Sequence, residues 1–182
     1  TELINVGIVG IGHLGKFHLQ QYLKISDVSV VGIYDINQEL SKKIADVNNI
    51  KSYHSLENLC NDCDAISIVT PTISHYKIAI IALSFDCHIF IEKPICDNLN
   101  HAKKLNVKAK KLKKIIQVGH IEHFNSAFNF LDKNSLFPKF IESHRLSVFN
   151  PRGTDVPVIL DLMIHDIGII ISLVPSSIIN IF

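Results

Sequence analysis

The sequence predicts an α/β protein built on a doubly wound parallel sheet, followed by the start of a second, incomplete α/β domain. Short runs that are apolar throughout alternate with segments of helical periodicity, which is typical of parallel strands covered by helices on both faces. A glycine-rich turn directly follows the first apolar run. The alternation stops after Gly119, so residues 1–120 are expected to form the first domain and residues 121–182 the second.

In the first domain, each apolar run is short enough to be a buried strand. Between the runs, apolar residues recur three or four positions apart, as Leu40, Ile44 and Val47 do, which is the spacing of an amphipathic helix. Strands are expected at residues 4–9, 28–34, 65–69, 87–91 and 115–118, and helices at residues 15–23, 38–47, 74–84 and 98–114. This order of elements predicts one parallel sheet.

The second domain shows a weaker pattern. Helices are expected at residues 123–133 and 156–174, and strands at residues 140–149 and 177–182. Two strands and two helices bury too little surface for an independent core. The chain also ends on Ile181-Phe182, inside an apolar strand whose exposed edge would be prone to aggregate. We therefore expect either that a longer protein continues past this strand or that a partner covers it.

Composition excludes several classes of protein. Hydrophobic residues make up 47% of the chain and charged residues 19%, which predicts a folded globule rather than a disordered chain. The net charge of +1 and the presence of only two arginines argue against nucleic acid as a partner. The apolar residues 157–174 are interrupted by Asp161, His165 and Asp166, which argues against a membrane span. Four cysteines and a start without a secretion signal predict a reduced, cytoplasmic compartment.

The glycine-rich turn, Gly10-Ile11-Gly12-His13-Leu14-Gly15, has the spacing GxGxxG between a strand and a helix, and Asp35 follows Gly15 by 20 residues. This context is the fingerprint of dinucleotide binding. Gly10 permits a tight turn, Gly12 lets a pyrophosphate approach the backbone, and Gly15 lets the helix pack closely on the strand. The helix N-terminus, including His13 and Leu14, offers N–H groups to the phosphates. The alternative is a glycine-rich turn without a ligand.

Asp35 predicts NAD rather than NADP as the cofactor. Its carboxylate would accept hydrogen bonds from the adenosine ribose hydroxyls and would repel a 2′-phosphate. The residues that follow it, Ile36-Asn37-Gln38, include no arginine or lysine to receive that phosphate. The alternative is an ordinary turn or N-cap aspartate.

Two further groups of residues have the chemistry of proton transfer. Glu92-Lys93-Pro94 follows the strand at residues 87–91, at the carboxyl edge where a doubly wound sheet binds ligands. Lys93 is there either a proton-transfer group or a surface charge paired with Glu92. Asp161 and His165 are four residues apart inside an apolar run, so they share one helix face and would be costly to bury without partners. This favours a site over a polar pair on the helix surface or a core histidine whose hydrogen bonds are satisfied.

Other patterns point to structural roles. Cys60-Asn61-Asp62-Cys63 lacks the second pair of ligands that a zinc site needs, and no metal site is expected. The helix at residues 98–114 carries its lysines on the face opposite an apolar stripe, which predicts a solvated surface. His18, one turn into the first helix, is expected to be a surface or packing residue.

Taken together, these residues resemble the Gfo/Idh/MocA family of NAD(P)-dependent oxidoreductases. The matching segments are Gly7–Gly15, Asp35, Val69–His75, Glu92–Ile95, Val118–His120 and Asp161–Asp166. The resemblance implies a Rossmann domain followed by a larger α/β domain with an open, mostly antiparallel sheet, which commonly mediates oligomerisation. The second domain of the family is far longer than the residues that follow position 120 here.

The resemblance also implies roles for individual residues. Lys93 corresponds to the catalytic or substrate-positioning lysine, His165 to the acid/base histidine, and Asp161 to the carboxylate one turn before it. The residues expected to line the cofactor pocket around the nicotinamide are Thr70, Pro71, His75, Glu92 and Lys93, with His120 near the same cleft.

The activity implied is hydride transfer between NAD and a hydroxyl-bearing carbon of a sugar, by a homo-oligomer. Residues 150–156, which lead into Asp161–Asp166, resemble a bacterial subgroup that acts on nucleotide sugars of the UDP-N-acetylglucosamine type. The alternatives are a dehydrogenase of free sugars or cyclitols, and an NAD-binding sensor or fragment without turnover. A sensor would need the glycines and Asp35 but not Lys93, Asp161 and His165.

Overall fold

A computed structural model describes residues 3–129, 136–146, 156–174 and 176–182. The chain divides into two compact units, Thr1–Gly119 and His120–Phe182. Within the described ranges, no helix is both long enough and apolar enough to cross a bilayer.

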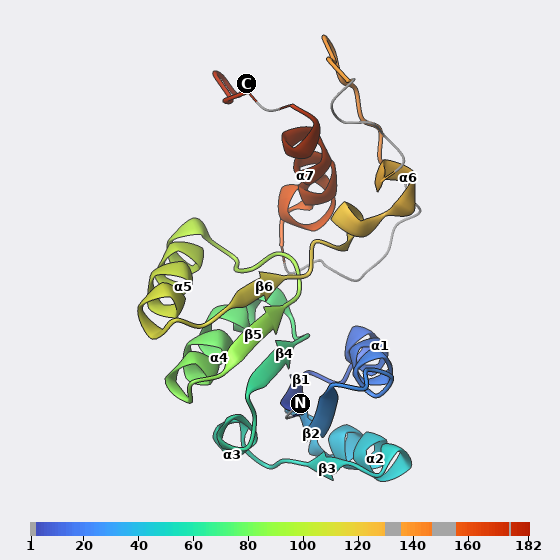
Figure 1. The fold of residues 1–182 in the computed structure, drawn as a ribbon, viewed down its shortest axis with the longest axis vertical. Coiled ribbons are helices and arrows are strands. Elements are labelled where there is room, and N and C mark those ends of the chain that lie inside the picture. Colours follow the sequence, from blue (N-terminus) through green and yellow to red (C-terminus); the bar gives the residue numbers. More distant parts are fainter. Residues whose placement is uncertain (1–2, 130–135, 147–155, 175) are drawn as a thin grey trace. The chain divides into compact units, whose positions relative to one another are not determined.

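The first unit is built around a six-stranded sheet with the order β3-β2-β1-β4-β5-β6, in which all neighbouring strands are parallel (Figure 1). This is the order of a doubly wound sheet, in which the chain winds outward from β1 to β3 and then from β4 to β6. The predicted fold class of this unit is confirmed. The strands are β1 (Ile4–Val9), β2 (Val28–Tyr34), β3 (Lys51–Ser52), β4 (Ala65–Ile68), β5 (His88–Ile91) and β6 (Ile116–Val118).

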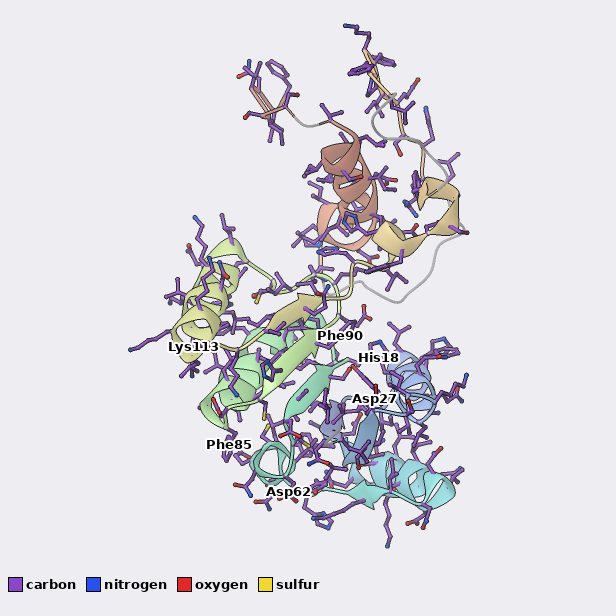
Figure 2. All side chains as sticks on the ribbon, in the orientation of Figure 1. His18, Asp27, Asp62, Phe85, Phe90 and Lys113 are labelled. Atoms are coloured by element: carbon purple, nitrogen blue, oxygen red, sulfur yellow. The ribbon has the colours of Figure 1, made fainter. Side chains whose placement is uncertain are left out.

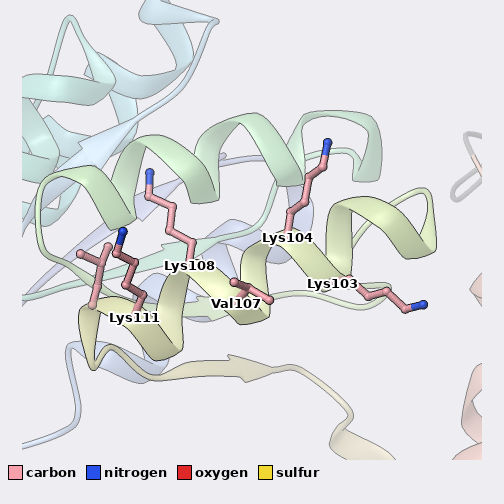
Figure 3. Close-up of a pocket in the computed structure, with 6 residues that line it drawn as sticks. Lys103, Lys104, Val107, Lys108 and Lys111 are labelled. Carbon is pink, nitrogen blue, oxygen red and sulfur yellow. The ribbon is translucent and has the colours of Figure 1, made fainter.

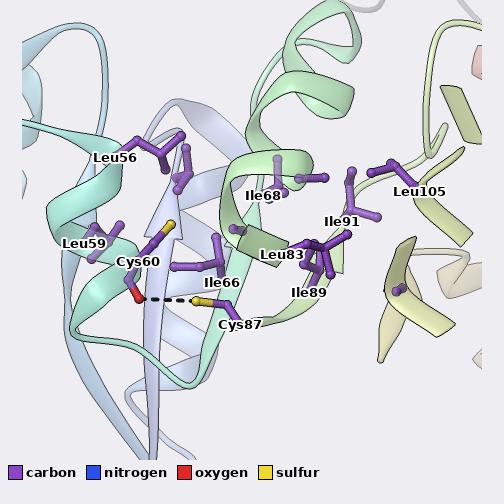
Figure 4. Packing of buried hydrophobic residues seen from close by; sticks show 14 of the residues in the cluster. Leu56, Leu59, Cys60, Ile66, Ile68, Leu83, Cys87, Ile89, Ile91 and Leu105 are labelled. Atoms are coloured by element: carbon purple, nitrogen blue, oxygen red, sulfur yellow. Dashed lines mark hydrogen bonds between the residues drawn. The ribbon is translucent and has the colours of Figure 1, made fainter. Parts of the chain in front are cut away.

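Helices cover both faces of this sheet, and for this reason its strands are mostly apolar, apart from the short edge strand β3. Successive strand residues face opposite sides, so Ile8 packs in one buried cluster with Leu19 and Ile33, whereas Val9 packs in the other. The second cluster is the larger one and includes Ile66, Ile68, Leu83, Ile91 and Leu105 (Figure 4). The helices of the first unit are α1 (His13–Tyr22), α2 (Gln38–Asn48), α3 (Leu56–Asn61), α4 (Thr72–Ser84) and α5 (Leu99–Leu112).

Two short elements between α2 and β4 are absent from the sequence prediction. Strand β3 has only two residues, too few for any periodicity, and exists because it pairs with Gly32 and Ile33 of β2. Helix α3 has six residues and is capped by Ser55, whose side chain accepts a hydrogen bond from the Asn58 N–H. Both elements are defined by their partners and caps rather than by a repeating pattern.

The cysteines of the first unit are free thiols and pack in its interior. The Cys87 thiol donates to the backbone carbonyls of Cys60 and Cys63, each at 3.3 Å, and so holds the end of α3 against β5 (Figure 4). Burial raises the pKa of the Cys63 thiol to about 12, which favours its protonated form at neutral pH. Among the described residues, no group of histidine, cysteine and carboxylate side chains could hold a metal ion.

Helix α5 buries Leu105 and Ala109 and turns most of its lysines to solvent, as its periodicity predicts. Figure 3 shows the lysine-lined groove along this helix, which has a volume of about 570 Å³. Lys108 is an exception, because its ammonium group donates to the Ile80 carbonyl of α4 at 3.2 Å. The groove is lined by Lys103, Lys104, Val107, Lys108, Lys111 and Leu112.

In the second unit, the described residues contain helices but no strand. These helices are a 3₁₀ turn, η1 (Ile121–Phe124), a short helix, α6 (Ser126–Asn129), a π-helical segment, η2 (Ile159–Met163), and α7 (Ile164–Leu173). The helix expected at residues 123–133 is therefore broken at Asn125, and its residues 130–133 lie outside the described ranges. The helix expected at residues 156–174 is present but begins with the wider π-helical turn.

The prediction of two strands in this unit is wrong for those of their residues that the structure describes. Residues 140–146 and 176–182 have no regular structure, and residues 147–149 lie outside the described ranges. Apolar alternation forms a strand only when a neighbouring strand supplies ladder hydrogen bonds, and the described part of this unit offers none. Ile179, Ile181 and Phe182 are accordingly exposed. The sheet through which an oligomer was expected is not formed by these residues.

Candidate functional site

A cavity of about 360 Å³ lies at the carboxyl ends of β1, β2 and β4. Strands β1 and β4 are neighbours in the sheet. After β1 the chain continues towards β2 and β3 on one side of the sheet, and after β4 it continues towards β5 and β6 on the other side. This point is the topological switch where doubly wound sheets bind ligands. The residues that line it come from the three strand ends and from α4: Val9, Gly10, Gly12, Tyr34, Asp35, Ile36, Val69, Thr70, Pro71, Ile73, Ser74 and Ile78.

The three glycines of the turn have three different surroundings. Gly10 has a φ of +87°, and a Cβ there would lie 2.6 Å from the Val69 carbonyl oxygen. A Cβ on Gly15 would lie 2.0 Å from the Gly10 carbonyl oxygen, so α1 packs directly on the turn. A Cβ on Gly12 would meet nothing within 4 Å. Gly12 therefore borders open space, which is what a passing pyrophosphate requires.

The first turn of α1 has no side-chain partner for its N–H groups. Its N-cap is Gly12, which has no side chain, and its first turn contains no acidic residue. His13 and Leu14 are exposed at this end of the helix, and His13 packs edge-on against Phe17. Helix N-termini of this kind bind phosphate through their N–H groups and dipole. The site therefore fits a dinucleotide.

Asp35 is tied to the glycine turn. One carboxylate oxygen accepts the Ile11 N–H at 2.8 Å and the other accepts the Asn37 N–H at 2.8 Å. The N-cap of α2 is Asn37, whose side chain accepts the Leu40 N–H, so the alternative of Asp35 as an N-cap is wrong. Each carboxylate oxygen can accept a second hydrogen bond, which leaves capacity for ribose hydroxyls at the wall of the cavity.

Glu92, directly after β5, has a partner that the sequence did not indicate. The His18 ring of α1 places Nε2 3.0 Å from Glu92 Oε1 and Nδ1 3.0 Å from Ser67 Oγ. The expectation of a surface or packing residue holds only for packing: the His18 side chain is 16% exposed, as is that of Glu92, and its ring packs on Phe90, but it also has polar partners that were not expected. Glu92 Oε2 accepts the Lys93 backbone N–H at 3.2 Å.

Glu92 is held as a carboxylate. Burial by itself would raise its pKa, but the hydrogen bond and charge of His18, the Lys93 N–H and the Lys93 charge outweigh burial and lower the pKa. An ionised carboxylate only accepts hydrogen bonds. His18 Nε2 must therefore carry the proton that it shares with Glu92.

His75 of α4 is almost fully buried, at 1% exposure. Its Nδ1 lies 2.9 Å from the Pro94 carbonyl oxygen and its Nε2 lies 2.9 Å from the Thr70 carbonyl oxygen. The ring thus bridges the loops that follow β4 and β5, and both nitrogens already face protein atoms. Thr70 and Pro71 line the cavity, whereas His75 lies behind them.

Asp161 and His165 belong to the second unit, together with His120. Asp161 lies in the π-helical segment and His165 in the first turn of α7. π-Helical turns are rare and often occur at functional sites. Both side chains are partly buried, and each interacts with other groups of the protein. That they meet Lys93 of the first unit stays a prediction.

Contacts within the second unit fix α7. The Arg145 guanidinium donates two hydrogen bonds to the Asp166 carboxylate, both at 3.0 Å, and these lower the pKa of Asp166. His123 of η1 packs on α7 at Gly168, where a Cβ would lie 3.2 Å from His123 Nε2. The His120 and His123 rings meet edge to face, with centroids 6.1 Å apart. Neither Arg145 nor His123 stood out in the sequence, because the α7 residues that they contact, Asp166 and Gly168, are distant along the chain.

The strand order, the glycine turn with open space at Gly12, and the Asp35 carboxylate directly after β2 define a dinucleotide-binding protein. The chain belongs to the Gfo/Idh/MocA oxidoreductase family: its residues 4–120 match that family, whose description is an NAD-binding Rossmann fold. The predicted family and NAD-binding fold are thereby confirmed.

Several characterised proteins are similar to this chain. It is 35% identical over 167 residues to a UDP-N-acetylglucosamine 3-dehydrogenase of Acidithiobacillus ferrooxidans, covering 91% of this chain and 53% of the relative. A solved structure of that enzyme matches 99% of this chain and 59% of its own, with a TM-score of 0.89 and 33% identity. An inositol 2-dehydrogenase/D-chiro-inositol 3-dehydrogenase of Lacticaseibacillus casei is 29% identical over 178 residues, covering 91% of this chain and 51% of the relative. The chain thus spans about half the length of these relatives.

Proposed function

We propose that the protein is an NAD-dependent dehydrogenase that oxidises a hydroxyl-bearing carbon of a nucleotide sugar. One observation carries the proposal: the cavity bordered by Gly12 and Asp35 opens at the same edge of the sheet to which β5 brings Glu92-Lys93-Pro94. Cofactor-binding and proton-transfer residues therefore share the carboxyl edge of one sheet.

The chain's own residues divide the work as follows. The N–H groups at the start of α1 bind the pyrophosphate, Asp35 binds the adenosine ribose, and Thr70 and Pro71 line the pocket towards the nicotinamide. When bound, NAD accepts a hydride from the substrate carbon. Lys93 or His165 removes the hydroxyl proton, and Asp161 orients His165 or a substrate hydroxyl.

A nucleotide sugar is favoured as the substrate class by the similarity to the UDP-N-acetylglucosamine 3-dehydrogenase, which is 35% identical to this chain. The segment that first suggested this class, residues 150–156, lies outside the described residues except for Val156. A free cyclitol is the second candidate, because an inositol dehydrogenase is also similar over 91% of this chain. An NAD sensor is less favoured, since sensing alone has no need of Lys93, Asp161 and His165.

The substrate class is tested by NADH absorbance on the complete gene product with a panel of UDP-sugars, free sugars and cyclitols. We expect UDP-N-acetylglucosamine to give the highest kcat/KM, because the diphosphate and nucleoside add binding energy far from the reacting carbon. Turnover of inositols alone would replace the nucleotide sugar by a cyclitol. Tight NAD binding without turnover of any of them would favour the sensor.

Asp35→Asn tests the cofactor preference. The asparagine retains an oxygen that can accept the Ile11 N–H but removes the negative charge that repels a 2′-phosphate. We expect the wild-type protein to bind NAD more tightly than NADP. In the variant, the ratio of the two dissociation constants should fall by about tenfold, which corresponds to about 1.4 kcal/mol. Dissociation constants from calorimetry provide the measurement. Equal affinities in the wild type would contradict the role of Asp35.

A further inference from the structure

Lys93 lies between two residues that are each held by a histidine from a different helix. Before it, the Glu92 side chain contacts His18 of α1; after it, the Pro94 carbonyl contacts His75 of α4. We propose that His18 and His75 are positioning residues that together fix the Glu92-Lys93-Pro94 segment, so that the Lys93 amine stays in reach of the substrate. The proposal rests on the dehydrogenase function proposed above.

The contact on the Glu92 side is built from several partners. The His18 ring is held on the sheet by Ser67 of β4 and meets the Phe90 ring edge to face, with centroids 5.5 Å apart (Figure 2). Ser67 and Phe90 are paired neighbours in the β4–β5 ladder, so His18 rests on a rigid surface. Its Nε2 proton then fixes one oxygen of Glu92.

The other oxygen of Glu92 accepts the Lys93 backbone N–H, so the orientation of the carboxylate directly determines where the Lys93 backbone begins. Gly119 closes the remaining side, because a Cβ at that position would lie only 3.0 Å from Glu92 Oε1. Glu92 is thus enclosed between a histidine and a glycine backbone. The Glu92 carboxylate therefore has little freedom to rotate. This keeps the Lys93 backbone, which is hydrogen-bonded to it, in a fixed position.

The contact on the Pro94 side joins two loops. His75 is buried and reaches the carbonyl of Pro94 with Nδ1 and that of Thr70 with Nε2, both at 2.9 Å. Carbonyl oxygens only accept, and a neutral imidazole carries one N–H, so one of these contacts at a time is a hydrogen bond; the ring packs between the loop that carries Lys93 and the loop that lines the cofactor cavity. A reacting group displaced by about 1 Å can lose 100-fold in rate, so a segment fixed at both ends has a direct value for catalysis.

Amide side chains separate the two contacts of His75. Asparagine can place its amide nitrogen near the position of Nδ1 and keep the Pro94 contact, whereas glutamine extends to the position of Nε2 and keeps the Thr70 contact. If the hold on Pro94 matters, His75→Asn should retain more activity than His75→Gln. For His18, glutamine is the conservative change, since its amide can donate to Glu92 from the Nε2 position.

The experiment compares His18→Ala, His18→Gln, His75→Asn and His75→Gln with a matched control, His88→Ala. His88 lies at the opposite end of the same strand, β5, where its Nδ1 accepts the Ile115 N–H at 3.1 Å. We expect His18→Ala and His75→Gln to lower kcat by about tenfold to 100-fold, with KM and NAD affinity little changed. His18→Gln and His75→Asn should recover much of the loss, and His88→Ala should behave as wild type.

A second readout does not depend on turnover. After ¹³C-methylation of lysine amines, the Lys93 resonance is assigned by its absence in Lys93→Arg. We expect it to shift or broaden in His18→Ala and His75→Gln but not in His88→Ala. An unchanged Lys93 resonance together with unchanged kcat in the folded His18→Ala protein would overturn the proposal. If no sugar is oxidised, the proposed function fails, but the Lys93 resonance still shows whether the two histidines position Lys93. If the His75 variants do not fold, the comparison of His18→Ala with His18→Gln decides alone.

Discussion

Lys93→Ala is expected to lower kcat by about 10²- to 10⁴-fold, the range for loss of a general acid or base, while NAD affinity changes little. The reason is the position of Lys93: it follows β5 at the carboxyl edge of the sheet, beside a Glu92 that is already engaged by His18. Steady-state kinetics on the complete gene product and NAD titration by calorimetry measure the two effects separately.

Lys93→Arg separates proton transfer from charge. Arginine keeps the positive charge but does not lose its proton in proteins, so we expect turnover nearly as low as in Lys93→Ala. Lys103→Ala, on the exposed face of α5, serves as the matched control and should turn over normally. Normal turnover in Lys93→Ala would contradict this role. Lys93 would then be a surface charge, and His165 would be the candidate for the residue that removes the proton.

Gly12→Ala is expected to weaken NAD binding without weakening the fold. A Cβ at this position meets no protein atom within 4 Å, so thermal stability should stay near that of the wild type. The same methyl group would fill the space along which the pyrophosphate approaches the turn. Overpacking of this kind costs about 1–3 kcal/mol, which corresponds to a loss of about five- to 150-fold in affinity.

Gly15→Ala provides the contrast. Its Cβ would lie 2.0 Å from the Gly10 carbonyl oxygen, so the turn and α1 must separate before any ligand arrives. We expect a lower Tm as well as poor NAD binding. Thermal unfolding and calorimetry on both variants distinguish the two effects. If Gly12→Ala bound NAD as tightly as the wild type, the pyrophosphate would not cross the turn at Gly12.

Local patterns were sufficient for the main elements of the first unit. The runs at residues 4–9 and 28–34 became β1 and β2 with those bounds, because strands buried on both faces are mostly apolar. Strand β3 and helix α3 were not predicted, because they show no such pattern. Elements of two and six residues are too short to show a period, and they exist through pairing with β2 and capping by Ser55.

The strands expected in the second unit show the limit of pattern reasoning. Residues 140–146 alternate partially between apolar and polar side chains, and residues 176–182 are largely apolar. A strand also needs hydrogen bonds from a neighbour. Without a paired neighbour among the described residues, the same sequence stays irregular.

For the candidate site, the sequence by itself determined the residues whose role follows from local geometry. Gly10, Gly12 and Gly15 belong to one turn, and Asp35 follows at the end of the next strand, so spacing alone placed them together. The same holds for Lys93 at the end of β5.

Only the tertiary structure decided how that lysine is held. His18 and Glu92 are 74 residues apart, and His75 and Pro94 are 19 residues apart, and no periodic pattern connects either pair. The parallel sheet brings the ends of β4 and β5 side by side, and the helices on its two faces deliver one histidine from each side. Hydrogen bonds made by side chains depend on positions within a few tenths of an ångström, which packing sets and sequence spacing does not.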